Sequence, residues 1–254
     1  LAPGVAAVWG ATYDALDLLT AGAEPTAARV LGEPHAALRL DQAPVEPVDG
    51  TASPDSRIIL SADPLIDERA DVGEGERPGR IERGKPIQIA LTQAISDALG
   101  WPLGQVRSAH YSTGDAEVQL VGILAPKDPA APEWDHAGVA LAPEVIDNFL
   151  APPTFVGMGY LDPASIGQLT VHAATASIDV WLPVDIDAID ADTAAETVSA
   201  IRRLGSTVRT TPIVTAYAAG VDAPVALSGT TPSIILATQP LLAGVTALHS
   251  AIVS

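Results

Sequence analysis

Two segments with apolar residues at helical spacing lie at opposite ends of this chain, and the stretches that resemble strands lie between them. In each segment the apolar positions recur every three or four residues, which is typical of one buried face of a helix. Gly22 is a suitable residue to end the first helix, which we expect over residues 3–22. The two faces are formed by Val5, Trp9, Thr12, Leu16 and Leu19 and by Leu241, Val245, Leu248 and Ile252.

The second segment lies in a long uncharged stretch, because no Asp, Glu, Lys or Arg occurs after Asp222. A membrane-spanning helix needs about 20 mostly apolar residues. The segment from Ile234 onward has that length, but Gln239, Pro240 and His249 interrupt it. We therefore expect an amphipathic helix that packs on the first helix and brings the two ends of the chain together on one side.

Three further helices are indicated by residues that start or stop a helix. Thr193 and Glu196 form a capping box, in which each side chain bonds an otherwise unpaired amide. Gly100 ends another of these helices, and Pro143 occupies the first position of the remaining one. The expected helices run from about Thr92 to Gly100, over Pro143–Leu150, and from Thr193 to Gly205.

Short extended runs separate these helices and predict a mixed, α+β fold. Prolines and Gly50 predict a loop over residues 44–54. The polar residues 63–85 predict an exposed excursion with at most one helical turn. The expected strands are His35–Leu40, Arg57–Ser61, Ile87–Ile89, Glu117–Leu124, Gly138–Leu141, Thr154–Leu161, Ser177–Val184 and Val208–Pro212.

The charge balance excludes several classes of partner. Thirteen Lys and Arg face 31 Asp and Glu, which gives a net charge of −18. Such a surface repels nucleic acids and anionic lipid headgroups, so we expect no nucleic-acid partner. Cysteine is absent, which excludes a thiol nucleophile, a cysteine-ligated metal and a disulfide.

The motifs that usually mark an enzyme are not found either. No two of the five histidines are three or four residues apart, and His136 beside Asp135 is best interpreted as a loop pair. The acidic residues at 185, 187, 190 and 192 lack the spacing of a calcium loop and suit the start of a helix, although cation binding there stays open. No nucleophile elbow, phosphate-binding loop or dinucleotide fingerprint occurs. We expect no catalytic, metal or cofactor site.

Four segments, taken in order, resemble the extracytoplasmic region of ABC transporter permeases of the FtsX/MacB-like, actinobacterial type. A helix that ends in Leu-Gly and leads through a turn into a strand is similar to one element of that family. A strand followed by a Pro-Lys-Asp-Pro turn and a nearby Trp is similar to another. The four segments are Arg29–Leu38, Ile89–Val106, Val118–Trp134 and Val180–Asp187.

The resemblance implies a non-catalytic extracytoplasmic domain at the outer face of the cell membrane. It implies a membrane-proximal α/β lobe, residues 1–110 and 190–254, with paired terminal helices, and an inserted strand-rich lobe, residues 111–189. The implied partners are the transmembrane helices of the same permease, a cytoplasmic ATPase acting through them, and a second permease copy or a cell-envelope protein. A free-standing exported solute-binding or sensor module, or less strongly a secreted hydrolase, is the alternative.

Two sets of residues follow from this interpretation as candidates for function. The paired terminal helices would transmit motion from the membrane by packing, and the loop after residue 126 would contact a partner. That loop also has a purely structural interpretation, in which Lys-Asp-Pro is an ordinary turn and Trp134 fixes it to the core. The helix candidates are Trp9, Leu16, Leu19, Leu241, Val245 and Leu248, and the loop candidates are Lys127, Asp128 and Trp134.

Overall fold

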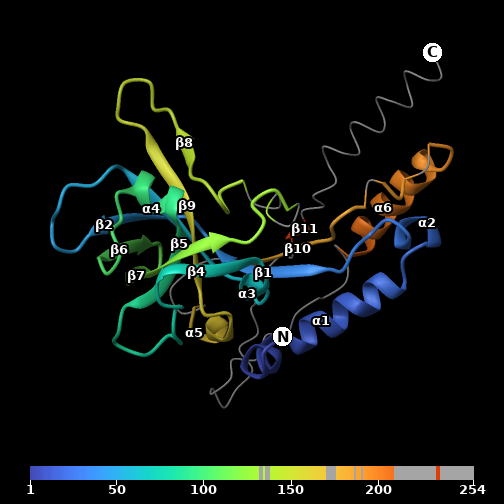
Figure 1. The fold of residues 1–254 in the computed structure, drawn as a ribbon, viewed down its shortest axis with the longest axis horizontal. Coiled ribbons are helices and arrows are strands. Elements are labelled where there is room, and N and C mark those ends of the chain that lie inside the picture. Colours follow the sequence, from blue (N-terminus) through green and yellow to red (C-terminus); the bar gives the residue numbers. More distant parts are fainter. Residues whose placement is uncertain are drawn as a thin grey trace.

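The computed structural model of the chain describes residues 1–131, 134, 138–169, 176–185, 187–189, 191–208 and 233–234. It combines helices and strands, which confirms the predicted α+β class. The helices are α1 (Pro3–Ala21), α2 (Pro25–Ala28), α3 (Ile66–Arg69), α4 (Gln93–Leu99), the 3-10 turn η2 (Pro163–Ser165), α5 (Ile166–Leu169) and α6 (Ala194–Val208). Figure 1 shows α1, α2 and α6 together at one end of the molecule, with the short helices α3, α4 and α5 near the strands.

Six strands close into a barrel, because the first and last of them pair with each other. Their order is β3–β2–β6–β7–β5–β9, and β9 pairs in parallel with β3 over seven residues. Closure leaves none of the six as a free edge, which keeps their backbone groups paired. These strands are β2 (Ala43–Pro47), β3 (Ser56–Ala62), β5 (Ile87–Thr92), β6 (Val106–Tyr111), β7 (Gly114–Pro126) and β9 (Thr154–Leu161).

The remaining strands extend the barrel at three places. One group continues outward from β3, a single strand pairs with β7, and another forms a hairpin with β9. The group beside β3 is antiparallel except for its last pair. These strands are β1 (His35–Leu40), β10 (Ala176–Trp181) and β11 (Ser233–Ile234) in the group, β4 (Ala70–Gly75) on β7, and β8 (Glu144–Ile146) on β9.

One continuous hydrophobic core joins the barrel strands. Leu60 of β3, Ile89 and Leu91 of β5, and Val118 and Leu120 of β7 are fully buried in it. Alternation of side chains along each strand explains this, because every second residue points to the same face of a sheet. Strands from both sides of the proposed boundary at residue 110 therefore share one core. The division into two lobes remains a prediction.

Helix α4 follows the predicted pattern closely. The Thr92 hydroxyl accepts a hydrogen bond from the Ile95 amide at 3.4 Å and thus caps the helix. Gly100 ends it in the left-handed conformation, with φ of 57°. The helix places Ile95 and Leu99 against β9, so the sequence signals for its start, end and buried face are all confirmed.

The first helix is also confirmed, with a partner that the sequence did not indicate. Trp9 and Leu16 are fully buried, and Thr12 is buried on the same face. The Trp9 indole Nε1 donates to the Pro163 carbonyl at 2.9 Å, which fastens α1 to η2. The expected partner, the helix after Ile234, lies outside the described residues.

Helix α6 begins after Thr193 as the capping box predicts, and it packs on α2. Ala200 and Ile201 form a small core with Ala27 and Val30. The helix reaches Val208, so its predicted end at Gly205 is wrong, and the strand predicted from Val208 falls partly outside the described residues.

Two sequence predictions are wrong, one because an apolar run was taken as a strand and one because Pro143 was taken as the first residue of a helix. Residues 138–141 form turns, although Val139 and Ala140 are buried as a cover over β9. Residues 143–150 form β8 and a loop instead of a helix. Their apolar side chains have helical spacing but face solvent, so no core contact supports a helix there.

Three strands lie where the residues predicted loops or no defined element. The loop predicted over 44–54 contains β2, and the excursion predicted over 63–85 contains β4 in addition to the one helical turn. Pro44 and Pro47 are tolerated because β2 pairs with β3 through only two residues and with β6 through three. Strand β6 was not predicted from the residues themselves, and only the resemblance of Ile89–Val106 implied a strand after the turn that follows α4.

Gly157 in β9 allows α4 to approach the barrel. A Cβ atom on Gly157 would lie 2.3 Å from the Ile95 Cγ2 atom, whereas a Cβ on Gly10 in α1 would meet nothing within 4 Å. We expect Gly157→Ala to lower the free energy of unfolding by about 1–3 kcal/mol through overpacking. Gly10→Ala should raise it by up to about 1 kcal/mol, because alanine favours a helix interior. Urea denaturation of both variants measures the two free energies of unfolding. Equal changes in the two variants would contradict the prediction.

Candidate functional site

A group of charged and aromatic side chains surrounds the single turn of α3. Strand β3 ends at Ala62, and the Asp63 carboxylate accepts the Leu65 amide at 2.9 Å, which turns the chain into α3. The same carboxylate forms an ion pair with Arg69, the last residue of that turn. Both side chains are largely withdrawn from water. We call Asp63, Arg69, Trp134 and Trp181 the Asp63–Arg69 cluster.

The Arg69 guanidinium lies between two tryptophans from distant parts of the chain. Its central carbon is 5.3 Å from the ring centroid of Trp134 and 5.5 Å from that of Trp181. The negative faces of aromatic rings attract a cation, and burial strengthens that attraction. Trp181 also stacks on His35 of β1 with 5.4 Å between ring centroids. The cluster thereby joins α3, β1, β10 and the segment around Trp134.

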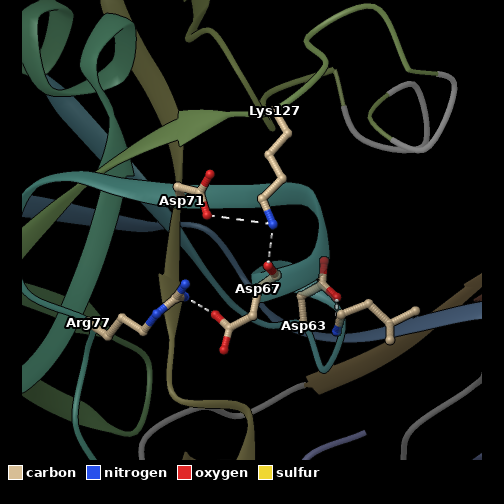
Figure 2. Close-up of polar contacts among 6 residues, drawn as sticks. Asp63, Asp67, Asp71, Arg77 and Lys127 are labelled. Atoms are coloured by element: carbon tan, nitrogen blue, oxygen red, sulfur yellow. Dashed lines mark hydrogen bonds and ion pairs between the residues drawn. The ribbon is translucent and has the colours of Figure 1, made fainter.

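Further ion pairs are exposed and link α3 to β4 and to the end of β7. Arg77 pairs with Asp67, and the Lys127 ammonium lies 3.5 Å from the Asp71 carboxylate. The Lys127 ammonium also donates to the Asp67 carbonyl at 3.0 Å. Figure 2 shows Lys127 over Asp67 and Asp71, with Arg77 reaching Asp67 from the other side.

The electrostatics of the interior affect two tyrosines near the cluster. Burial raises the pKa of Tyr13 and of Tyr160 above the usual range, and the negative charge of Asp63 adds to the effect. The positive charge of Arg69 partly offsets it in both cases. Tyr13 belongs to α1, so the field of Asp63 reaches the first helix.

A further buried cation lies on the barrel and was not foreseen. Arg107 of β6 is fully buried, with its guanidinium 4.8 Å from the Trp101 ring centroid. It donates to the Gly100 carbonyl at 2.6 Å and to the Gln105 side chain at 3.1 Å. Burial lowers the pKa of Arg107 to about 10, so it stays charged at neutral pH. These contacts fix the turn after α4.

The three predicted loop residues have different surroundings. Lys127 is half-exposed and takes part in the ion pairs described above. The Asp128 carbonyl accepts the Trp134 indole Nε1 at 2.9 Å, and its carboxylate accepts the Ala130 amide at 3.0 Å. Trp134 is buried, so its side chain fixes the loop to the core, as the structural interpretation expected. Lys127 and Asp128 remain candidates for contact with a partner.

A cavity of about 500 Å³ opens beside this loop, where β4 and β7 meet the start of α4. Its wall is mostly apolar, and the Thr92 hydroxyl at its edge donates to the Leu141 carbonyl at 2.7 Å. Pro126 and Pro129, on either side of Lys127 and Asp128, line it. The other lining residues are Gly73, Glu74, Gln93, Ala94, Ile123, Leu124 and Ala125.

The predicted helix residues divide into those that are described and those that are not. Trp9 and Leu16 lie together on the buried face of α1. The side chain of Leu19 and the residues Leu241, Val245 and Leu248 lie outside what the structure describes. The pair Asp135 and His136 and the residue Asp190 lie outside it as well.

Sequence reasoning missed Asp63, Arg69, Trp181 and Arg107. Asp63 directly follows an apolar strand and precedes Pro64, which is a weak signal for a turn. Nothing local marks Arg69 or Arg107 as buried. The two tryptophan rings on Arg69 come from distant positions. The partners of Arg107 are near in sequence, but they surround it only because the turn after α4 folds back on β6. Among the described residues, no three His, Asp or Glu side chains are grouped as metal ligands would be, and no helix is long and apolar enough to cross a membrane.

Comparison of the chain with protein-family models and with curated proteins finds no match. The site is therefore interpreted from its geometry and from the resemblance of the four segments.

The buried ion pair should matter far more for stability than the exposed pairs do. We expect Arg69→Met to lower the free energy of unfolding by about 3–5 kcal/mol, because it leaves the Asp63 charge buried without its partner. The control Arg77→Met removes an exposed pair and should change it by at most about 1 kcal/mol. Equal losses in urea denaturation would show that the cluster is not the stabilising feature.

The raised tyrosine pKa values predict a loss of stability in alkali. The folded state holds the phenolic protons of Tyr13 and Tyr160 more tightly than the unfolded state does. The contribution of these two groups is therefore full below pH 10 and falls as the pH rises above it, by about 1.4 kcal/mol per pH unit for each group. Tyr111, whose pKa burial also raises, adds to this fall, and Arg107, whose pKa burial lowers, opposes it. Tyr160→Phe should remove the contribution of one tyrosine from the slope of stability against pH. Urea unfolding from pH 9 to 11 measures it, and a pH-independent stability would refute it.

Proposed function

We propose that the chain is a non-catalytic extracytoplasmic domain of an FtsX/MacB-like ABC transporter permease. In this role it couples movement of transmembrane helices to an external substrate or partner. The resemblance of the four segments suggests the family. One structural observation supports the coupling: α1 is fastened to the barrel body through the buried Trp9 and Leu16 and through the bond from Trp9 to Pro163. A displacement of α1 would therefore shift the body with it.

A series of interactions suggests a route from α1 to the partner loop, of which the first is electrostatic and the others are contacts. Tyr13 of α1 lies within the field of Asp63, and Asp63 holds Arg69. Arg69 contacts Trp134, whose indole donates to the carbonyl of Asp128. In the proposal, motion of α1 reaches the exposed residues Lys127 and Asp128 along this route.

The proposal places the domain at the outer face of the cell membrane. Residues 1–110 and 190–254 would form the membrane-proximal lobe, and residues 111–189 the strand-rich lobe. Because β7 and β9 of the second lobe belong to the barrel, the lobes would be joined by strand pairing and not by a linker. A cytoplasmic ATPase would act through the transmembrane helices, and a second permease copy or a cell-envelope protein would be the outer partner.

The cavity beside Pro126 favours a second candidate, a free-standing exported solute-binding or sensor module. A volume of about 500 Å³ with a mostly apolar wall suits a small ligand. The full-length gene product discriminates between the two. Apolar segments of about 20 residues on both sides of the chain favour the permease, whereas a lone signal peptide favours the module.

Substitutions on α1 test the coupling in the intact transporter. Leu16 is fully buried against the body, and Leu18 on the same helix is 77% exposed. We expect Leu16→Glu to abolish transport while binding of the ATPase persists, and Leu18→Glu to leave both unchanged. Because a buried charge also destabilises the fold, the milder Leu16→Ala should lower transport in part, with folding checked by circular dichroism. Normal transport in both Leu16 variants would contradict the proposal.

A further inference from the structure

The hairpin formed by β8 and β9 ends in an apolar tip that extends away from the body (Figure 1). Phe149 is 96% exposed and Leu150 is completely exposed, and Val145 on β8 is more than half exposed. Large apolar side chains that adjoin one another on a surface usually mark an interaction site. The base of the hairpin is firm, because β9 is also a barrel strand paired with β3.

The backbone at the tip adopts a conformation that is unfavourable for its residue. Phe149 has a φ of 58°, and among the described residues it is the one non-glycine residue with a positive φ. A bulky side chain rarely adopts this left-handed conformation, which glycine and asparagine tolerate better. Contacts with the core do not impose it, since the Phe149 side chain is almost wholly in solvent.

The polar groups of the loop hold this conformation. The Asp147 carboxylate accepts the Phe149 amide at 2.9 Å. The Asn148 side-chain amide donates to the Pro152 carbonyl at 3.0 Å and to the Thr154 hydroxyl at 2.9 Å. The loop thus uses its own hydrogen bonds to present two apolar side chains outward in one geometry. Such preorganisation lowers the entropy lost when a partner binds.

The charge around the tip limits the chemistry of that partner. No Lys or Arg occurs between Lys127 and Arg202, whereas Glu144 and Asp147 adjoin the apolar residues. At the base of the hairpin, Asp55 accepts a hydrogen bond from Thr154, and Arg57 of β3 lies across β9 from Glu144. A second copy of this chain and an anionic bilayer are both negative and would be repelled. A protein surface with Lys and Arg around an apolar pocket would be attracted.

We propose that the tip of the β8–β9 hairpin is a docking element for a protein partner with an apolar pocket and a cationic rim. Phe149 and Leu150 fill the pocket, and Glu144 with Asp147 faces the rim. The inference does not depend on the permease assignment, because it follows from the hairpin alone. It adds a contact site separate from Lys127 and Asp128.

The test replaces Phe149 in the full-length protein with the photoreactive p-benzoylphenylalanine, in the cells that produce it. A protein that is cross-linked at position 149 and not at position 18 is then purified and titrated with the full-length protein. Phe149→Gly should raise its dissociation constant tenfold or more, as for an aromatic anchor in a pocket. The same variant should keep or gain stability, because glycine favours the left-handed conformation. Leu18→Ser is the matched control on a distant exposed leucine and should leave binding unchanged.

Measurements of salt dependence and of vesicle binding distinguish this protein partner from a second copy of the chain and from a lipid bilayer. Affinity for the cross-linked protein should fall as NaCl rises from 50 to 500 mM, because the contact includes opposite charges. Four results would overturn the inference: no cross-linked protein, cross-links only to a second copy, co-sedimentation with phosphatidylcholine vesicles that Phe149→Gly abolishes, or binding that Phe149→Gly leaves unchanged. None of these readouts involves transport, so they are independent of the proposed function.

Discussion

Pairing of β3 with β9 is the constraint on which the rest of the structure depends. It joins residues about a hundred positions apart, closes the barrel, and gives its core a boundary on every side. Gly157 and Gly159 lie within this pairing and leave room for Ile95 and Ile58. The closed barrel then supplies a rigid base for the features that extend from it, which are the α3 turn, the α1 contact and the β8–β9 hairpin.

The Asp63–Arg69 cluster explains how peripheral elements are held to that base. Desolvation of an ion pair is unfavourable unless geometry and further contacts offset it. Here two tryptophan rings and the Leu65 amide provide those contacts. One ring comes from β10 and the other from the segment at Trp134. The Asp63–Arg69 ion pair therefore holds together parts of the chain that are far apart in sequence. The coupling proposed for α1 depends on this arrangement.

The chain uses apolar residues in two opposite ways. On α1 and α6 they have helical spacing and are buried, so periodicity predicted both helices and their buried faces correctly. At residues 143–150 the same kind of spacing occurs, but the residues are exposed at a hairpin tip. The helix predicted there relied on Pro143 as a start signal, and such a signal does not show whether a surface exists to cover the apolar residues, which is why the prediction is wrong. The strongly negative charge, in contrast, was evident from composition and limits the partners of that tip.

The sequence alone determined the elements that depend on interactions between neighbouring residues. The Thr92 cap with Gly100, the start of α6 after Thr193, the buried face of α1 and most strands required only neighbouring residues, because caps and periodicity act within a few turns. Closure of the barrel, strands β2, β4 and β6, burial of Arg69 and Arg107, and the outward position of Phe149 were decided by the tertiary structure. Most of these depend on partners distant in sequence or on the lack of a covering surface. The partners of Arg107 are near in sequence but meet it only because the turn after α4 folds back on β6, so no local pattern of residues encodes its burial.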